Sequence, residues 1–336
     1  MSNEKKSGNA FTNNPLVRAV GAQRIVVLLA LIVLFVFFCI KSPAFRTYPT
    51  MLSILGYSYY ITLMAIGVTF CLITAGVDLS IGTGTVAYAL IGGYCVVNLG
   101  LPIGVGILVT ILLGVLFGTM NGALVAVLEL PPFIATLCTM MIVRGVGSIV
   151  SGGMSVTWPS VGTPQGWFRS IFRIQIGETM YPIGFLWIIL LIIAMTIVLN
   201  KTKLGRYIIA IGSNKEATRL SGVKVVKYHM AAYMISGFFT GLAGVAYAAT
   251  FQAIAAASGA GLELDAIAGA IIGGTSMTGG SGSIVGTLIG VFIMSMLKTG
   301  LPYIGLQANW QQIITGVVLI VAVGVDVIKN KRLARR

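Results

Sequence analysis

The sequence is dominated by apolar segments, each about as long as a helix needs to be to cross a bilayer. A spanning helix requires about 20 mostly apolar residues, and soluble domains carry about 25% charged residues. Here 57% of the residues are hydrophobic and only 9% are charged. We therefore predict an all-α polytopic membrane protein that forms one domain over residues 1–336 and has about ten transmembrane helices. The predicted spans are 25–41, 53–75, 80–99, 103–128, 132–151, 182–200, 228–250, 263–279, 283–300 and 309–328.

Basic residues cluster in three places outside these spans. Because Lys and Arg are enriched in cytoplasmic segments, we predict that the tail 1–24, the loop 201–227 and the tail 329–336 are cytoplasmic. Six predicted spans precede the loop and four follow it, and both even numbers return the chain to the cytoplasm. Eight spans would also satisfy this parity if two short segments were re-entrant. The net charge of +14 is therefore explained by basic segments that flank helices inserted in a lipid bilayer. We predict no nucleic-acid partner.

The basic loop contains the pattern of a short capped helix. Asn214 is a good N-cap, Glu216 suits the positive first turn, and Gly222 can end the helix in left-handed geometry. A membrane protein that presents such a helix to the cytoplasm offers a contact point to a partner. The predicted contact residues are Asn214, Lys215, Glu216, Ala217, Thr218, Arg219, Leu220, Ser221 and Gly222.

Glycines recur every four residues in three of the predicted spans. Small residues at this spacing let helix backbones approach closely in lipid, so we predict close helix packing at these positions. The residues are Gly114, Gly118 and Gly122, then Gly237 and Gly241, then Gly286 and Gly290.

One long segment, 151–182, is predicted on the side of the membrane opposite the basic loop. Its Pro, Gly and Trp content indicates an ordered cap. Because Trp prefers the membrane interface, we expect Trp158 and Trp167 to lie there.

Two segments combine glycine, hydroxyl and acidic residues at the ends of apolar segments: TAGVDLSIGTG (74–84) and ELDAIAGAIIGGTSMTGGSG (263–282). Short helices interrupted by glycine at corresponding places in two halves point to a transport path. The two segments follow the starts of predicted spans two and seven. This odd offset inverts orientation, so spans 2–5 and 7–10 are a candidate inverted repeat.

Asp78 is the strongest single candidate in these segments for a residue of the transport path. A charge at the bilayer centre costs roughly 2.5–3.5 kcal/mol, so it needs a partner or water. Asp78 is either a helix cap together with Ser80 or part of a path, and the two roles are compatible. For Glu263 and Asp265 we favour a capping role, whereas Arg144 either faces an aqueous cavity or extends to the interface.

Motifs for nucleotide binding and for catalysis are missing from the sequence. No G-x-x-x-x-G-K-[ST] motif occurs, so the chain has no P-loop. The four cysteines all lie in apolar segments and form no C-x-x-C pair, which predicts neither a disulfide framework nor a metal site. Without a Ser/His/Asp set either, we expect no enzyme and no cofactor bound by this chain.

Five blocks in one order carry a resemblance that covers essentially the whole chain. The chain resembles the membrane (permease) subunit of bacterial ABC importers for sugars, in the branch that includes the ribose and galactose permeases. The blocks are GVDLSIG (76–82), PPFIATL (131–137) followed by RG at 144–145, TKLGRYIIAIGSNKEATRLSGV (202–223), ELDAIAGAIIGGTSMTGGSGSIVGT (263–287) and WQQIITG (310–316) with Asp326.

The resemblance implies a dimer of permease subunits in the bacterial inner membrane, each multi-pass with both termini in the cytoplasm. The architecture would be of the type II importer kind, similar to the vitamin-B12 importer. Two cytoplasmic P-loop ATPase subunits would hold ATP and Mg²⁺, and a periplasmic or lipid-anchored sugar-binding protein would deliver a ribose-type pentose or a galactose-type hexose. An ABC permease for a nucleoside or a branched-chain amino acid stays open as an alternative, as does an ion-coupled secondary transporter.

The resemblance also implies roles for individual residues. The helix over 214–222 becomes the coupling helix in an ATPase groove, with Glu216 and Arg219 as candidates for ion pairs across that interface. The path or its gates would be lined by Asp78, Ser80, Thr275 and Ser276. Acids on the binding protein would pair with Arg169, Arg173 and Lys298.

Overall fold

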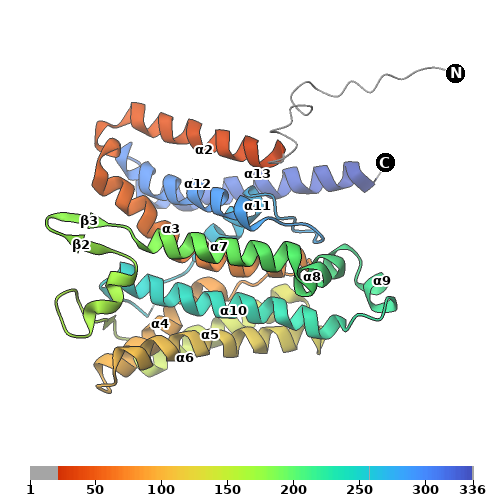
Figure 1. Cartoon of the computed structure of the whole chain (residues 1–336), viewed down its shortest axis with the longest axis horizontal. Coiled ribbons are helices and arrows are strands. Elements are labelled where there is room, and N and C mark those ends of the chain that lie inside the picture. The colour runs from red at the N-terminus through yellow and green to blue at the C-terminus, as the bar shows by residue number, and fades with distance from the viewer. Residues whose placement is uncertain (1–21, 257, 335–336) are drawn as a thin grey trace.

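Long apolar helices build most of the molecule (Figure 1). The structure, a computed structural model, describes residues 22–256 and 258–334. Within this part of the chain eight helices are long and apolar enough to cross a membrane, which makes the chain a multi-pass membrane protein. These helices are α2 (Ala22–Lys41), α3 (Tyr48–Ile73), α5 (Ile103–Ala126), α6 (Pro132–Ser151), α7 (Gly184–Lys201), α10 (Val225–Thr250), α12 (Ile284–Tyr303) and α13 (Ala308–Ala334).

Two of the ten predicted spans are shorter than predicted. The segment 80–99 forms α4 (Ile81–Val97), and the segment 263–279 forms only α11 (Leu262–Ile272). Eleven residues rise about 16 Å, roughly half of the hydrocarbon thickness. Each short helix follows a non-helical stretch: residues 74–80, where Ala75 has a φ of 60°, and the loop that ends at Gly261 with a φ of 90°. The described residues therefore contain eight helices of spanning length, and the shorter helices α4 and α11 occupy the two remaining predicted positions.

The two ends of the bundle differ in what they carry (Figure 1). The amphipathic helix α8 (Lys203–Ser213), α9 (Lys215–Leu220), the start of α2 and the end of α13 lie at one end. The hairpin of β2 (Ile174–Ile176) and β3 (Thr179–Tyr181) lies at the other. We call these the α9 end and the β2–β3 end.

The tails predicted at the α9 end are only partly described. Residues 1–21 of the predicted tail 1–24, and Arg335 and Arg336, lie outside the described residues. The segment 329–334 is helical, because α13 continues through Ala334, and the cytoplasmic position of both tails stays a prediction.

Glycine contacts set the closest helix approaches, as predicted. A Cβ atom added at Gly237 of α10 would lie 2.1 Å from the carbonyl oxygen of Gly114 of α5, and one added at Gly118 would lie 2.7 Å from the Cα atom of Gly237. On α12, a Cβ atom at Gly290 would lie 2.0 Å from the Gly269 oxygen of α11. No side chain fits at these crossings, so the glycine spacing fixes how α5 packs on α10 and how α11 packs on α12.

An ordered cap closes the β2–β3 end. Strand β1 (Val156–Thr157) pairs with β4 (Ala253–Ile254), and the helical turns η1 (Pro43–Arg46) and η2 (Gly166–Ile171) complete the cap. Trp167 is 54% exposed, but Trp158 is fully buried and its Nε1 donates a hydrogen bond of 2.9 Å to the Ala89 oxygen of α4. The interfacial position predicted for Trp158 is therefore wrong, because this indole anchors the cap to the bundle.

Candidate functional site

Helix α9 has the caps that the sequence predicts. The Asn214 side chain accepts a hydrogen bond of 2.9 Å from the Ala217 backbone N–H, and Gly222 has a φ of 79°. Thr218 faces inward and is buried, whereas Leu220 is 84% exposed. A six-residue helix with an exposed leucine and no cover on its outer face is a suitable contact point for another protein.

The charges on α9 are satisfied within the chain. Glu216 and Arg219 pair with each other at 2.7 Å, three residues apart, with side chains 64% and 68% exposed. Lys215 pairs at 3.3 Å with Glu129, which lies in the turn between α5 and α6. Such exposed pairs contribute little to stability, about 0–1 kcal/mol. Glu216 and Arg219 therefore remain accessible to partner charges.

Helix α8 ends against the last residue of α3 and against the loop after α11. A Cβ atom added at Gly212 would lie 1.7 Å from the Ile73 oxygen and 2.6 Å from the Gly280 nitrogen. The Gly280 N–H in turn donates to the Ile73 oxygen at 2.9 Å. We call these three residues the glycine junction. It joins the end of α8, immediately before α9, to the loop before α4 and to the loop after α11.

Asp78 and Ser80 form a buried polar cluster with residues of α5 and α10. Asp78 is 1% exposed, and its Oδ1 accepts hydrogen bonds from the Ser80 N–H at 3.0 Å and the Ser80 hydroxyl at 2.6 Å. Its Oδ2 accepts a bond of 2.7 Å from the Ser236 hydroxyl of α10. The Asn121 amide of α5 donates hydrogen bonds of 2.9 Å to the Ser80 hydroxyl oxygen and of 3.4 Å to Asp78 Oδ1. In this conformation the carboxyl group ties the loop 74–80 to two neighbouring helices.

Thr275 and Ser276 lie in the loop 273–283 near the α9 end. Both are buried, and the Ser276 hydroxyl donates a hydrogen bond of 2.8 Å to Asp326 of α13. The Met277 N–H donates to the same carboxylate oxygen at 3.1 Å. Asp326 therefore holds this loop against α13, and the four predicted path residues form two clusters, one at each loop.

The three residues predicted to meet a binding protein have different environments. Arg169 is 6% exposed, and its guanidinium donates to the carbonyl oxygens of Pro159, Trp158, Ala249 and Phe251 at 2.8–3.3 Å. Burial lowers its pKa. A guanidinium surrounded in this way cannot reach a partner's acid, so the docking role predicted for Arg169 is wrong.

Lys298 is not free on the surface either. It forms an ion pair with Asp265 of α11, and the side chains are only 20% and 2% exposed. Thr315 of α13 donates to the other oxygen of Asp265 at 3.5 Å. The docking role of Lys298 and the capping role of Asp265 are therefore both replaced by this interior pair. Arg173 is half-buried near the β2–β3 hairpin, where burial lowers its pKa, and its docking role stays a prediction.

Four polar residues inside the helices were not predicted as site residues: Asn121, Ser236, Gln311 and Gln312. The signal that could have identified them is a polar side chain inside an otherwise apolar span, since such residues cluster at pathways in membrane proteins. Among the described residues no group of His, Cys, Asp and Glu could hold a metal ion.

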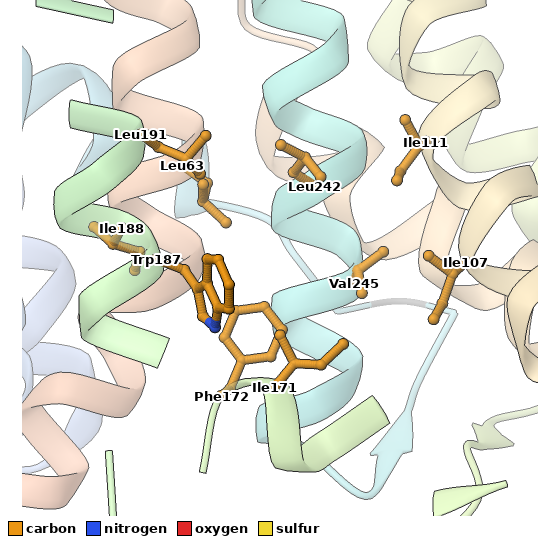
Figure 2. Close-up of a pocket in the computed structure, with 10 residues that line it drawn as sticks. All are labelled: Leu63, Ile107, Ile111, Ile171, Phe172, Trp187, Ile188, Leu191, Leu242 and Val245. Carbon is orange, nitrogen blue, oxygen red and sulfur yellow. The ribbon is translucent and has the colours of Figure 1, made fainter. Parts of the chain in front are cut away.

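An apolar cavity of about 230 Å³ lies between α3, α5, α7, α10 and η2. Figure 2 shows its lining, including Leu63, Ile107, Trp187 and Leu242. The side chains are hydrocarbon apart from one indole nitrogen, so the cavity offers almost nothing to bind a polar solute.

Comparison with known proteins places the chain among transport permeases. The family model described as "Branched-chain amino acid transport system / permease component" matches residues 50–323. The chain is 36% identical over 311 residues to the ribose import permease protein RbsC of Escherichia coli (strain K12), covering 89% of this chain and 92% of that protein. It is 36% identical to the ribose import permease protein RbsC of Bacillus subtilis (strain 168), over 90% and 92%.

A galactose relative is nearly as similar. The galactose/methyl galactoside import permease protein MglC of Escherichia coli (strain K12) is 32% identical over 320 residues, covering 91% of this chain and 94% of that protein. No solved structure matches the chain. The match over residues 50–323 includes α9, the Asp78 cluster and the glycine junction, and it shows that the chain belongs to the branched-chain amino acid transport system / permease component family.

Proposed function

We propose that this chain is the permease subunit of an ATP-driven ABC importer that carries a monosaccharide into the cytoplasm. The observation that carries the proposal is the near full-length similarity to import permeases named for ribose and galactose. A fructose import permease protein of Rhizobium meliloti is also similar, with 32% identity over 77% of this chain. The expected substrate is accordingly a ribose-type pentose or a galactose-type hexose. ATP and Mg²⁺ would be held by a separate ATPase subunit, because the sequence has no P-loop.

The proposed location is the bacterial inner membrane with the α9 end in the cytoplasm. The basic loop 201–227 lies at that end, together with the start of α2 and the end of α13. A Lys and Arg excess favours the cytoplasmic side. The β2–β3 end would then face a sugar-binding protein, with Arg173 as the remaining candidate for a contact to it.

In the proposed mechanism, α9 sits in a groove of the ATPase. Movement of α9 would pass through the glycine junction to the loops next to α4 and α11, because Gly212 contacts backbone atoms of Ile73, which ends α3 just before the first loop, and of Gly280 in the second. The Asp78 cluster and the Thr275–Ser276 loop lie along these two connections and would act as gates. A second permease subunit, identical or related, would complete the path.

The proposed architecture is that of a type II importer with an inverted repeat. Support comes from the position of the two short helices: α4 follows α3, α11 follows α10, and α3 and α10 each have 26 residues. A Cβ atom added at Gly82, in the first turn of α4, would lie 2.6 Å from the Glu263 nitrogen of α11. The two short helices therefore begin next to each other, as two halves related by an inverted symmetry would place them.

The substrate is tested by transport. The chain is purified with its ATPase, reconstituted in vesicles, and supplied with D-ribose, D-galactose, D-fructose, a nucleoside or leucine together with the binding protein. Vanadate-sensitive uptake of one of the sugars is expected. Uptake of leucine or the nucleoside alone would favour the alternative that the family description suggests. Uptake that needs an ion gradient and no ATP would refute the ABC assignment.

The coupling role of α9 is tested by exchanging its ion pair. In the double variant Glu216→Arg with Arg219→Glu the helix keeps an internal pair, which is worth about 0.2–0.5 kcal/mol. At each of the two positions, the sign of the charge that faces the ATPase is reversed. ATP-driven uptake is expected to fall at least about tenfold, as loss of one charged contact would cause. Unchanged uptake would show that these charges do not contact the ATPase.

A further inference from the structure

A polar pocket of about 430 Å³ lies between α11, α12 and α13. Its volume falls within the range of about 300–1,000 Å³ that is usual for small-molecule sites. We propose that this pocket is a monosaccharide-binding site of the permease. The proposal rests on the proposed function, since it takes the substrate to be a sugar. The lining side chains that carry the argument are Asp265, Lys298, Gln311, Gln312 and Thr315.

The pocket contains the groups that recognise sugar hydroxyls. A hydroxyl both donates and accepts hydrogen bonds, so it pairs with a carboxylate, an ammonium or an amide. Here the buried Asp265–Lys298 ion pair supplies an acceptor and a donor side by side. The Gln311 amide donates a hydrogen bond of 3.1 Å to the Lys298 carbonyl oxygen, and this bond fixes the Gln311 side chain in the pocket wall. The apolar cavity of Figure 2 offers no comparable set of groups.

The position of the pocket suits an entry site. Lys298 lies five residues before Tyr303, the last residue of α12, which corresponds to about 8 Å along the helix. The Thr50 hydroxyl donates a hydrogen bond of 2.8 Å to the Tyr303 hydroxyl oxygen. The nearby Tyr48 hydroxyl donates one of 2.5 Å to the Met180 carbonyl oxygen of β3. The pocket therefore lies just below the β2–β3 end, where a sugar released by a binding protein would enter.

The pocket is not closed within this chain. Gln312 is exposed, and Leu264 at its rim is 40% exposed. Polar groups at this depth are costly against hydrocarbon, so they face water or another protein.

Helices α6, α4, α11 and α13 pack side by side in this order. Arg144, on α6 at the other edge of this row, is also exposed and donates 3.3 Å to the Thr83 hydroxyl oxygen. The row therefore carries polar groups at both edges and would border the water-filled path.

The test uses pocket variants that keep the ion pair intact. Gln312→Leu and Thr315→Val are introduced separately, and the control is Gln307→Leu, the same change in the exposed turn before α13. Vesicles with the full importer are assayed for uptake of D-ribose, D-galactose and D-fructose and for ATP hydrolysis stimulated by the binding protein. Loss of one hydrogen bond to the sugar is expected to reduce uptake of the carried sugar about tenfold. ATP hydrolysis should stay within about twofold of wild type, since the contact to the ATPase is distant.

A second measurement detects binding directly. In the variant Ala260→Cys a thiol is placed in the pocket wall, and labelling by a small maleimide is followed with and without the sugar, after subtraction of the wild-type signal. The sugar should slow labelling of Ala260→Cys but not of the control Gln307→Cys. The inference is overturned, and the proposed function kept, if wild type imports a sugar while both pocket variants match it and labelling is unaffected. If wild type imports none of the three sugars, the proposed function and this inference fail together.

Discussion

Replacement of Asp78 tests whether the buried polar cluster holds the loop before α4. The variant Asp78→Leu removes the acceptor of three hydrogen bonds of 2.6–3.0 Å, two from Ser80 and one from Ser236, and of a longer one of 3.4 Å from Asn121, which keeps its bond to Ser80. Leaving a buried donor without a partner costs about 1–3 kcal/mol, so three donors cost at least about 3 kcal/mol. At about 2 °C per kcal/mol, the apparent melting temperature in detergent should fall by about 6 °C.

Three further variants separate the lost hydrogen bonds from other effects of the change. Asp78→Asn keeps a carbonyl oxygen for Ser80, and the Ser236 hydroxyl can turn to accept from the new amide, so its decrease should be less than half as large. Adding Ser236→Ala to Asp78→Leu removes a stranded donor and should recover part of the loss. Glu178→Leu, at the exposed turn between β2 and β3, serves as the control.

The assay is fluorescence-detected gel filtration after heating, which reports the folded fraction of a membrane protein without purification. Uptake is measured on the same variants at 20 °C, well below the expected transition. The reasoning is refuted if Asp78→Leu melts within about 1 °C of wild type, or if Ser236→Ala makes the double variant still less stable. A stable Asp78→Leu that has lost uptake would mean that the carboxyl group serves the path rather than the fold.

Three other changes have definite expected results. Gly212→Ala would place a methyl group 1.7 Å from the Ile73 oxygen, so uptake should be lost while ATP hydrolysis by the complex persists. Gly237→Ala would place one 2.1 Å from a backbone oxygen of α5, and overpacking of about 1–3 kcal/mol should lower the melting temperature by several degrees. Its control is Gly145→Ala, which meets no atom within 4 Å and should melt like wild type. Arg169→Met frees four carbonyl oxygens, and amide hydrogen exchange of the cap should accelerate about 100-fold.

Features that depend on local sequence were predictable. The length of an apolar segment reports a spanning helix directly, and the eight long helices follow the hydropathy. The caps of α9 depend only on Asn214, on Gly222 and on residues within one turn of them. The glycine spacing on α5 and α10 predicted a close approach, because a missing Cβ atom has the same consequence wherever the partner lies.

Features that depend on distant partners were not predictable. Asp78 and Ser236 are 158 residues apart, and Asp265 and Lys298 are 33 apart, so no local pattern relates them. Hydropathy also cannot separate a long helix from a short helix that continues into an apolar, glycine-rich loop. For this reason the segment 263–279 was predicted as one span, although α11 ends at Ile272. Arg169 was misjudged because an arginine in a predicted external segment is ordinarily exposed.

The glycine junction connects these local and distant features. The hydropathy pattern does not predict the contacts of Gly212. Its backbone nevertheless contacts the end of α3 and the loop after α11 at the same point. Because backbone atoms meet there without intervening side chains, a displacement of α8 and α9 cannot be absorbed by a change of rotamer. It must move the Ile73 oxygen and the Gly280 nitrogen, and with them the loops that carry Asp78 and Thr275. A small movement at α9 would thus reach both polar clusters together.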